Sequence, residues 1–314
     1  MSGVSAGQPR PAGKSAARVT LCPLGRHLDV SVLSMRPLLR TRQWATARTL
    51  AARWAPFVLL LTGAAARDTR QGVAMVLLLG LAAALLVDRF RPLPEGRRAL
   101  PWAAALPVGL GLAWGTITGP VALPDLGSCA DPLSPPAAWR ALEALVVLGA
   151  TAALTPIGGS EPLLLRRPRD ARVVALAVLA PVAAIPAVLL GPPAAGPFFG
   201  EVNVAFPLAS FLPAAVMALA NAALEEVSYR GALMGWGGRA IGPGAALVVQ
   251  ALVFGFAHWG PDVQAGALLI LASMAASGVV LGIVARRTGS LLLPFAIHAA
   301  VDIPLYHALA CRLG

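Results

Sequence analysis

Long apolar stretches without a charged residue recur along almost the whole chain and limit what it can fold into. They cover residues 71–87, 99–124, 144–160, 173–200, 202–224, 240–257 and 263–285. Most are close to the ~17–25 residues that an α-helix needs to cross a bilayer. Only 12% of the residues are charged, against roughly 25% in an average soluble domain. The sequence therefore predicts an all-α protein, a polytopic transmembrane bundle of about eight or nine helices.

Three regions follow from the positions of these stretches. Residues 1–53 predict a basic cytoplasmic tail that is partly disordered, because they hold no apolar run long enough to span a membrane. Residues 54–200 carry the N-terminal transmembrane helices, and residues 201–314 carry a membrane core with the chemical groups. Met35 is a second plausible start of the chain, which leaves open whether residues 1–34 are native and how many helices precede residue 71.

The basic residues lie mainly on alternate loops. With a cytoplasmic N-terminus, 20 of the 25 Lys and Arg residues fall on the cytoplasmic side, which is the positive-inside pattern. This pattern explains the net charge of +11 by membrane topology, so we expect a lipid bilayer and no nucleic acid as partners. The high content of Ala, Arg, Gly and Pro favours a GC-rich bacterial genome, and hence a multi-pass protein of a bacterial inner or plasma membrane. The three cysteines show no CxxC spacing, so no disulfide framework or thiolate metal site is predicted.

A pair of glutamates ends the charge-free run 202–224. Glu225 and Glu226 are followed by Arg230, and the spacing of Glu226 and Arg230 predicts an ion pair on one helix face that orients the helix. A second carboxylate beside this pair is hard to justify structurally. Ionisable residues inside membrane helices are functional candidates by default, which favours a chemical role for Glu225.

Two histidines downstream are predicted to lie close to this pair of glutamates. Glu225 lies 15 residues before residue 240, the centre of a Gly-rich turn, and His258 lies 18 residues after it. At ~1.5 Å per residue, their depths in a helical hairpin differ by only about 5 Å. His298 and Asp302 share one face of the last helix. Such a group, in a low dielectric, is suited to activating a water molecule.

The residues resemble three motifs of the CPBP intramembrane proteases, which include the type II CAAX prenyl endopeptidases and bacteriocin-processing relatives. Glu225-Glu226-Val-Ser-Tyr-Arg230 matches EExxxR, Phe254-Gly-Phe-Ala-His258 matches FxxxH, and His298-Ala-Ala-Val-Asp302 matches HxxxN or HxxxD. The motifs occur in the same order, and the resemblance covers roughly residues 205–311. Three short motifs in order on successive membrane segments are far more specific than any one of them.

The resemblance implies that Glu225 and His258 hold and deprotonate a water molecule, which attacks a peptide carbonyl group. His298 and residue 302 would then stabilise the oxyanion. Asp302 departs from the common Asn, and an ionised carboxylate cannot donate a hydrogen bond. Asp302 is therefore protonated, or it orients His298, or His298 stabilises the oxyanion alone.

A zinc site is the alternative use of the same atoms. Glu225, His258 and His298 could provide three ligands and leave a fourth position open for water. The sequence lacks HExxH, and the resemblance implies a metal-free glutamate mechanism as the better account. We therefore expect no required cofactor, with zinc as the alternative.

The sequence thus predicts an intramembrane endopeptidase that acts on a membrane-associated peptide or membrane protein. A catalytically silent membrane scaffold, or a bacteriocin-immunity-type protein of the same fold, is the alternative that Asp302 keeps open. A proton-coupled transporter is less favoured, because the first half shows no repeat of the charged motif. The substrate, the use of prenylated substrates and the oligomeric state remain open.

Overall fold

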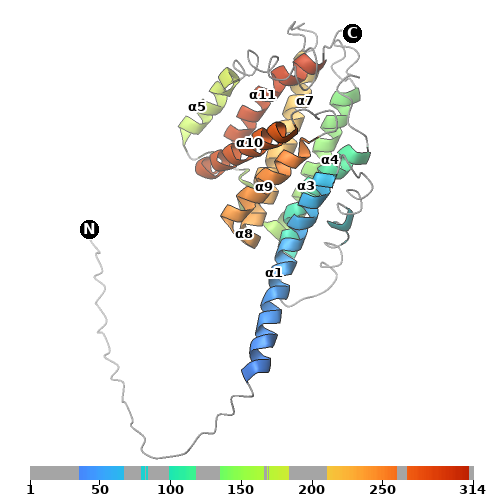
Figure 1. Cartoon of the computed structure of the whole chain (residues 1–314). Coiled ribbons are helices and arrows are strands. Elements are labelled where there is room, and N and C mark those ends of the chain that lie inside the picture. Colours follow the sequence, from blue (N-terminus) through green and yellow to red (C-terminus); the bar gives the residue numbers. More distant parts are fainter. Residues whose placement is uncertain are drawn as a thin grey trace, which may run out of the picture. The chain divides into compact units, whose positions relative to one another are not determined.

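The part of the chain that the structure describes consists of helices and connecting turns, without a strand (Figure 1). The structure is a computed structural model and describes residues 35–66, 79–81, 83, 99–117, 135–165, 168, 170–183, 211–259 and 267–310. The chain divides into two units, Met1–Ala45 and Thr46–Gly314. Of the first unit, only the helical residues 35–45 are described, so the predicted disorder at its start lies outside the described residues. The predicted all-α helical bundle is confirmed for the second unit.

Several helices overlap the predicted apolar stretches, but the first helix begins at Met35, inside the predicted tail 1–53, and most of the predicted stretch 173–200 lies outside the described residues. The helix bounds are α1 (Met35–Ala66), α3 (Ala99–Ile117), α4 (Pro135–Gly158), α5 (Ala171–Leu179), α7 (Phe211–Glu225), η6 (Glu226–Trp236), α8 (Gly237–Ile241), α9 (Pro243–Ala257), α10 (Ala267–Thr288) and α11 (Leu292–Ala310). Three described segments are long and apolar enough to cross a membrane: Ala137–Gly158, Phe211–Ile241 and Leu268–Thr288. The chain is therefore a membrane protein. Most of the predicted span 71–87 lies outside the described residues.

The helix that carries the paired glutamates runs without a break from Phe211 to Ile241, as the sequence predicted. Its middle part, η6, is a π-helix rather than the expected α-helix. π-helical segments are rare and are often found at functional sites. The hairpin turn falls at Gly242, whose φ of +92° suits glycine, and α9 starts at Pro243.

Two glycines of η6 let another backbone segment lie against the π-helix. A Cβ atom on Gly231 would lie 3.3 Å from the carbonyl oxygen of Leu163, and one on Gly235 would collide with the carbonyl oxygen of Pro162. Trp236 fixes the same segment by donating its Nε1–H to the carbonyl oxygen of Gly159 at 2.8 Å. The segment after α4 thus supports the wide turns of η6 from outside.

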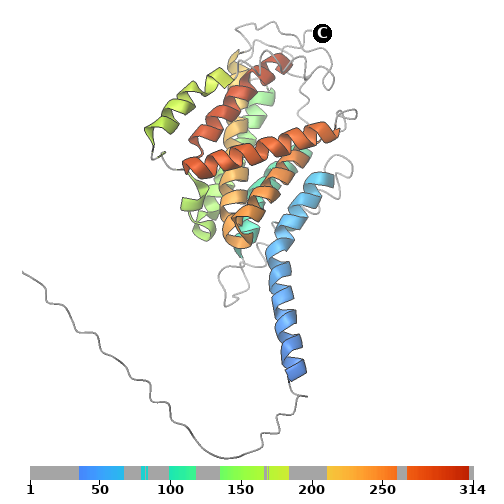
Figure 2. The ribbon, with the colours of Figure 1, turned by 60° about the vertical axis from the view of Figure 1, so that its left-hand side comes forward.

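Helices α9 and α10 approach each other through small residues. A Cβ atom on Gly255 would lie 2.8 Å from the carbonyl oxygen of Leu271, and one on Gly278 would lie 3.0 Å from the Cα atom of Ala251. Small residues on both helices thus permit close helix packing. Figure 2 shows α10 lying across the neighbouring helices rather than parallel to them.

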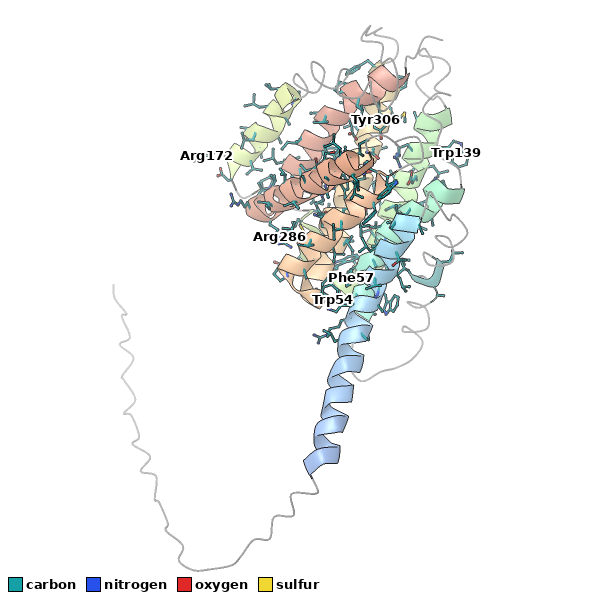
Figure 3. All side chains as sticks on the ribbon, in the orientation of Figure 1. Trp54, Phe57, Trp139, Arg172, Arg286 and Tyr306 are labelled. Atoms are coloured by element: carbon teal, nitrogen blue, oxygen red, sulfur yellow. The ribbon has the colours of Figure 1, made fainter. Side chains whose placement is uncertain are left out.

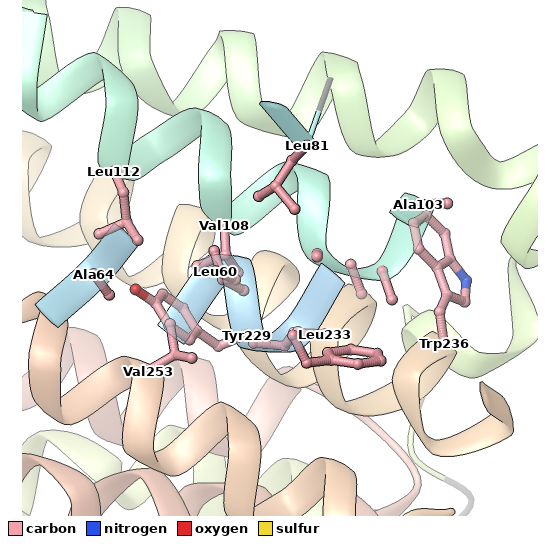
Figure 4. Packing of buried hydrophobic residues seen from close by; sticks show 14 of the residues in the cluster. Leu60, Ala64, Leu81, Ala103, Val108, Leu112, Tyr229, Leu233, Trp236 and Val253 are labelled. Carbon is pink, nitrogen blue, oxygen red and sulfur yellow. The ribbon is translucent and has the colours of Figure 1, made fainter. Parts of the chain in front are cut away.

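A hydrophobic cluster joins four of these elements beside the paired glutamates (Figure 4). Leu60 of α1, Val108 of α3, Leu233 of η6 and Val253 of α9 are all almost fully buried in it. Helices from both predicted membrane regions, 54–200 and 201–314, therefore build one core. This packing holds η6 and α9 in place around the ionisable residues.

Candidate active site

The two glutamates lie at the junction of α7 and η6, deep in the bundle. Glu225 is the last residue of α7 and Glu226 the first of η6. Both side chains are buried, and Glu226 is only 1% exposed. Such burial is costly for carboxylates unless charged or hydrogen-bonding groups surround them, so their neighbours determine what each can do.

Glu226 connects two charged partners. Its Oε1 atom lies 3.0 Å from Nη1 of Arg230 and 2.8 Å from Nδ1 of His298. Among the described residues, no nitrogen of the Arg230 guanidinium group has a hydrogen-bond partner, so the short contact to Glu226 is a charge interaction rather than a directed hydrogen bond. The predicted ion pair is present, and it additionally holds a histidine from α11.

His298 has a defined orientation as a result. A carboxylate only accepts hydrogen bonds, so the hydrogen on the Glu226 side of the ring must be on Nδ1. The opposite atom, Nε2, lies 3.5 Å from Oε2 of Glu225 and 3.5 Å from Oδ2 of Asp302. The structure therefore brings Glu225, His298 and Asp302 together, as the sequence predicted.

His258 lies at the C-terminal end of α9 and faces Glu225. Its Nδ1 atom donates to the carbonyl oxygen of Phe254 at 2.8 Å, because a carbonyl group can only accept. This bond leaves Nε2 of the neutral ring as a hydrogen-bond acceptor. The Glu225 carboxylate interacts electrostatically with His258 and with His298.

The Phe254 ring packs between the three motifs. The Cζ atom of Arg230 lies 4.3 Å from its centroid, which is a cation–π contact. The rings of His258 and His298 lie 4.6 Å and 6.2 Å from the same centroid. Phe254 therefore contacts the charge of Arg230 and the rings of both histidines.

Sequence reasoning missed several polar residues around this site. Asn221, one turn before Glu225 on α7, donates from Nδ2 to Oδ2 of Asp302 at 2.8 Å. Arg140 of α4 forms a 2.6 Å ion pair with Glu143 and interacts electrostatically with Tyr306. The only signal for Asn221 was an amide side chain in the charge-free run 202–224, which also contains Asn203. Arg140 and Tyr306 lie outside the motifs, and only the fold brings them together.

Among the described residues, Oε2 of Glu225 and Oε2 of Glu226 are both buried without a hydrogen-bond partner, but the Glu226 carboxylate is already held through Oε1 by Arg230 and His298. The Oε2 atom of Glu225 makes no hydrogen bond with any of the described residues, although it faces His298. Such an oxygen can accept a hydrogen bond from a small molecule and then a proton from it. Within the described ranges, no group of three or more His, Cys, Asp or Glu side chains is arranged to hold a metal ion.

Comparison with known proteins agrees with the motifs. Residues 207–304 match the family model of the type II CAAX prenyl endopeptidase Rce1-like proteins, so this part of the chain is an Rce1-like domain. The predicted membership of the CPBP proteases is confirmed over these residues, and it supports a protease of the CAAX type. No curated protein matches the chain, and no solved structure matches it either.

Replacing Glu226 by Gln should destabilise the protein strongly. Arg230 is fully buried and would lose its carboxylate partner, and breaking a buried ion pair typically costs about 3–5 kcal/mol. Thermal unfolding of the purified protein in detergent measures this loss. Glu225→Gln, the same change one residue earlier, is the control and should cost less than half as much, because the contact of Glu225 is the longer 3.5 Å one to His298 and not a 3.0 Å pair with a fully buried arginine. Equal stability of Glu226→Gln and wild type would contradict the structural role of Glu226.

Proposed function

We propose that the chain is an intramembrane endopeptidase that hydrolyses a peptide bond of a membrane-associated peptide or membrane protein. The observation that carries this proposal is the buried Oε2 atom of Glu225, which lacks a hydrogen-bond partner in the described part of the chain and faces His298. The Rce1-like domain over residues 207–304 supports the same activity. We expect no nucleic acid among the partners.

Glu225 acts as the general base in this mechanism. A water molecule placed between Glu225 and His258 donates one hydrogen to the carboxylate and the other to Nε2 of His258. The hydrogen bond from His258 to the carbonyl oxygen of Phe254 supports this arrangement, because it keeps Nε2 available as an acceptor. Glu225 removes a proton as the water oxygen attacks the peptide carbonyl carbon.

The attack converts the carbonyl oxygen into an oxyanion, which needs hydrogen-bond donors. In its imidazolium form, His298 presents an Nε2–H group, while its Nδ1–H remains bonded to Glu226. Glu225 then passes its proton to the leaving amine as the C–N bond breaks. Water is consumed, two new chain ends form, and Glu225 returns to its starting state.

The substrate class and the metal dependence are finer parts of the proposal. A membrane peptide or membrane protein fits a site built from membrane helices, and the bacterial composition makes prenylated substrates less favoured than other peptides. We propose a metal-free glutamate mechanism. The alternative is a zinc metalloprotease, with Glu225, His258 and His298 as ligands.

Cleavage assays on Glu225→Gln with and without a chelator test these points. A panel of detergent-solubilised membrane peptides serves as substrate for wild type and variant. We expect kcat to fall by roughly 10²–10⁴-fold in Glu225→Gln, the usual contribution of a general base. Wild-type activity should persist in 1,10-phenanthroline, with the non-chelating 1,7-isomer as the matched control.

Other results would redirect the proposal. Activity lost only with the chelating isomer would assign Glu225, His258 and His298 to zinc. Unchanged activity in Glu225→Gln would contradict its role as the base. A folded wild-type protein that cleaves no peptide, yet binds a membrane partner equally well with Glu225→Gln, would favour the silent scaffold or immunity-type protein.

We further propose that the N-terminus is cytoplasmic and that the protein resides in a bacterial plasma membrane. The positive-inside pattern places Cys129 outside and Cys22 inside. In single-cysteine variants, an impermeant maleimide should label Cys129 in intact spheroplasts and Cys22 only after permeabilisation. The reverse labelling would contradict this orientation.

A further inference from the structure

Asn221 and Asp302 form a buried hydrogen bond between two helices of the candidate site. Helices α7 and α11 pack against each other, and Nδ2 of Asn221 donates to Oδ2 of Asp302 at 2.8 Å. The two residues are only 3% and 7% exposed. Figure 3 shows this end of α11, marked by Tyr306 one turn beyond Asp302, beside α7. The Asp302 carboxyl group is therefore held from the helix that also carries Glu225, one turn after Asn221.

The Asp302 carboxyl group is held through one of its two oxygens. Oδ2 accepts the hydrogen bond from Asn221, and Nε2 of His298 lies 3.5 Å from the same atom. His298 is already oriented at its other ring nitrogen by Glu226 at 2.8 Å, so Asp302 is not needed to orient that ring. The χ2 angle of an aspartate is broad and roughly two-fold, and the hydrogen bond from Asn221 fixes it here. Since Oδ2 accepts from Asn221, a hydrogen carried by Asp302 lies on Oδ1.

The charges around His298 indicate that Asp302 is neutral. Nε2 of His298 lies 3.5 Å from Oε2 of Glu225 and 3.5 Å from Oδ2 of Asp302. The proposed mechanism uses His298 as an imidazolium and Glu225 as a carboxylate, so these two charges match each other. The Glu226–Arg230 pair, 3.0 Å apart, is matched as well. The four charges therefore sum to zero without Asp302.

Two further groups near Glu225 leave this balance unchanged. Arg140 of α4 lies 2.6 Å from Glu143, so its positive charge is matched by that carboxylate. His258 is neutral, with its hydrogen on the Nδ1 atom that donates to the carbonyl oxygen of Phe254. An ionised Asp302 would therefore add an unmatched negative charge to a buried site, which is strongly unfavourable. A neutral Asp302 has one hydrogen to donate, from Oδ1.

We propose that Asn221 is a positioning residue of the peptidase reaction, which holds Oδ2 of a neutral Asp302 so that Oδ1–H donates to the oxyanion. This inference rests on the proposed endopeptidase function. As water adds to the carbonyl carbon, the π electrons of the C=O bond move onto oxygen, which accepts from Asp302 and from Nε2–H of His298. The Asp302 proton stays on Asp302, while the proton taken from water passes through Glu225 to the leaving amine.

Two Asp302 variants test the neutral donor. Asp302→Asn cannot ionise, keeps an oxygen that accepts from Asn221 and supplies N–H donors. Its kcat should stay within about tenfold of wild type, whereas Asp302→Leu should lower kcat by roughly 10²–10³-fold, the usual cost of one lost oxyanion donor. The affinity for a phosphinic peptide, a stable analogue of the tetrahedral intermediate, should follow the same order. An Asp302→Asn protein that loses as much activity as Asp302→Leu would mean that an ionised carboxylate is required, and would overturn the inference.

The Asn221 variants test the positioning role separately. Asn221→Leu should lower kcat by about 10²-fold with KM little changed, because a donor displaced by about 1 Å no longer fits the transition state. Combined with Asp302→Leu, it should cause little further loss, because Asn221 acts through Asp302. Asn221→Gln keeps the amide and should restore part of the activity. Asn221→Ala removes the same amide with a smaller side chain and replaces Asn221→Leu if that variant fails to fold.

Gln250→Leu is the matched control for Asn221→Leu. Gln250 of α9 is also a buried amide, and its Nε2 atom donates to the carbonyl oxygen of Gly278 at 2.8 Å. Its Oε1 atom, like Oδ1 of Asn221, has no hydrogen-bond partner among the described residues. Gln250→Leu should therefore change the thermal stability much as Asn221→Leu does, but should leave kcat and the phosphinic-peptide affinity unchanged.

Two further results would overturn the inference. One is a folded Asn221→Leu or Asn221→Ala protein whose kcat matches wild type. The other is an additive loss in the Asn221→Leu and Asp302→Leu pair. Either result, combined with the expected loss in Glu225→Gln, rejects the role of Asn221 alone. No effect of Glu225→Gln would instead reject the endopeptidase mechanism on which the inference rests.

Discussion

The carboxylate of Glu226 is the contact on which the rest of the site depends. It lies 3.0 Å from Arg230 and 2.8 Å from His298, in a region where Arg230 is fully buried. A charge taken so far from water is tolerated only beside an opposite charge, so each partner requires the other. The same carboxylate orients His298 and joins η6 to α11. This structural use of Glu226 leaves its neighbour Glu225 free for chemistry.

Phe254 connects the Glu226–Arg230 pair of η6 and the α11 histidine to a third helix, α9. Its ring lies under the Arg230 guanidinium group and beside His258 and His298. Short motifs on three separate membrane segments therefore form a single packed unit. A change in any one of them shifts the others, because buried side chains in a close-packed interior have little room to move. The order of the motifs along the chain thus corresponds to one site in space.

The helices that follow from local hydrophobic patterns could be predicted from the sequence. Apolar runs predicted the helices around Glu225, and the hairpin depths predicted that His258 would meet it. The π-helix could not be predicted, because its wide turns depend on Gly231 and Gly235 receiving the Pro162–Leu163 backbone from another segment. Helix propensities describe residues within a single helix and take no account of contacts with other segments of the chain.

The polar surroundings of the site were unpredictable for a related reason. Asn221 and Tyr306 lie outside the three motifs, and their local sequence does not show which residues they contact. Arg140 lies near the N-terminal end of α4, outside the three motifs. Their significance comes from contacts across α4, α7 and α11, between residues as far apart as Asn221 and Asp302. Contacts between residues so far apart in the sequence can be identified only when the fold is known.

An experimental structure of the wild-type protein with a bound phosphinic peptide tests the central claim most directly, which is that Glu225 activates water without a metal. The account predicts one phosphinyl oxygen within hydrogen-bond distance of Glu225 and the other facing the α11 side chains. It also predicts no anomalous scattering signal between Glu225, His258 and His298. A zinc ion ligated by these three residues, or an analogue bound away from Glu225, would contradict the account.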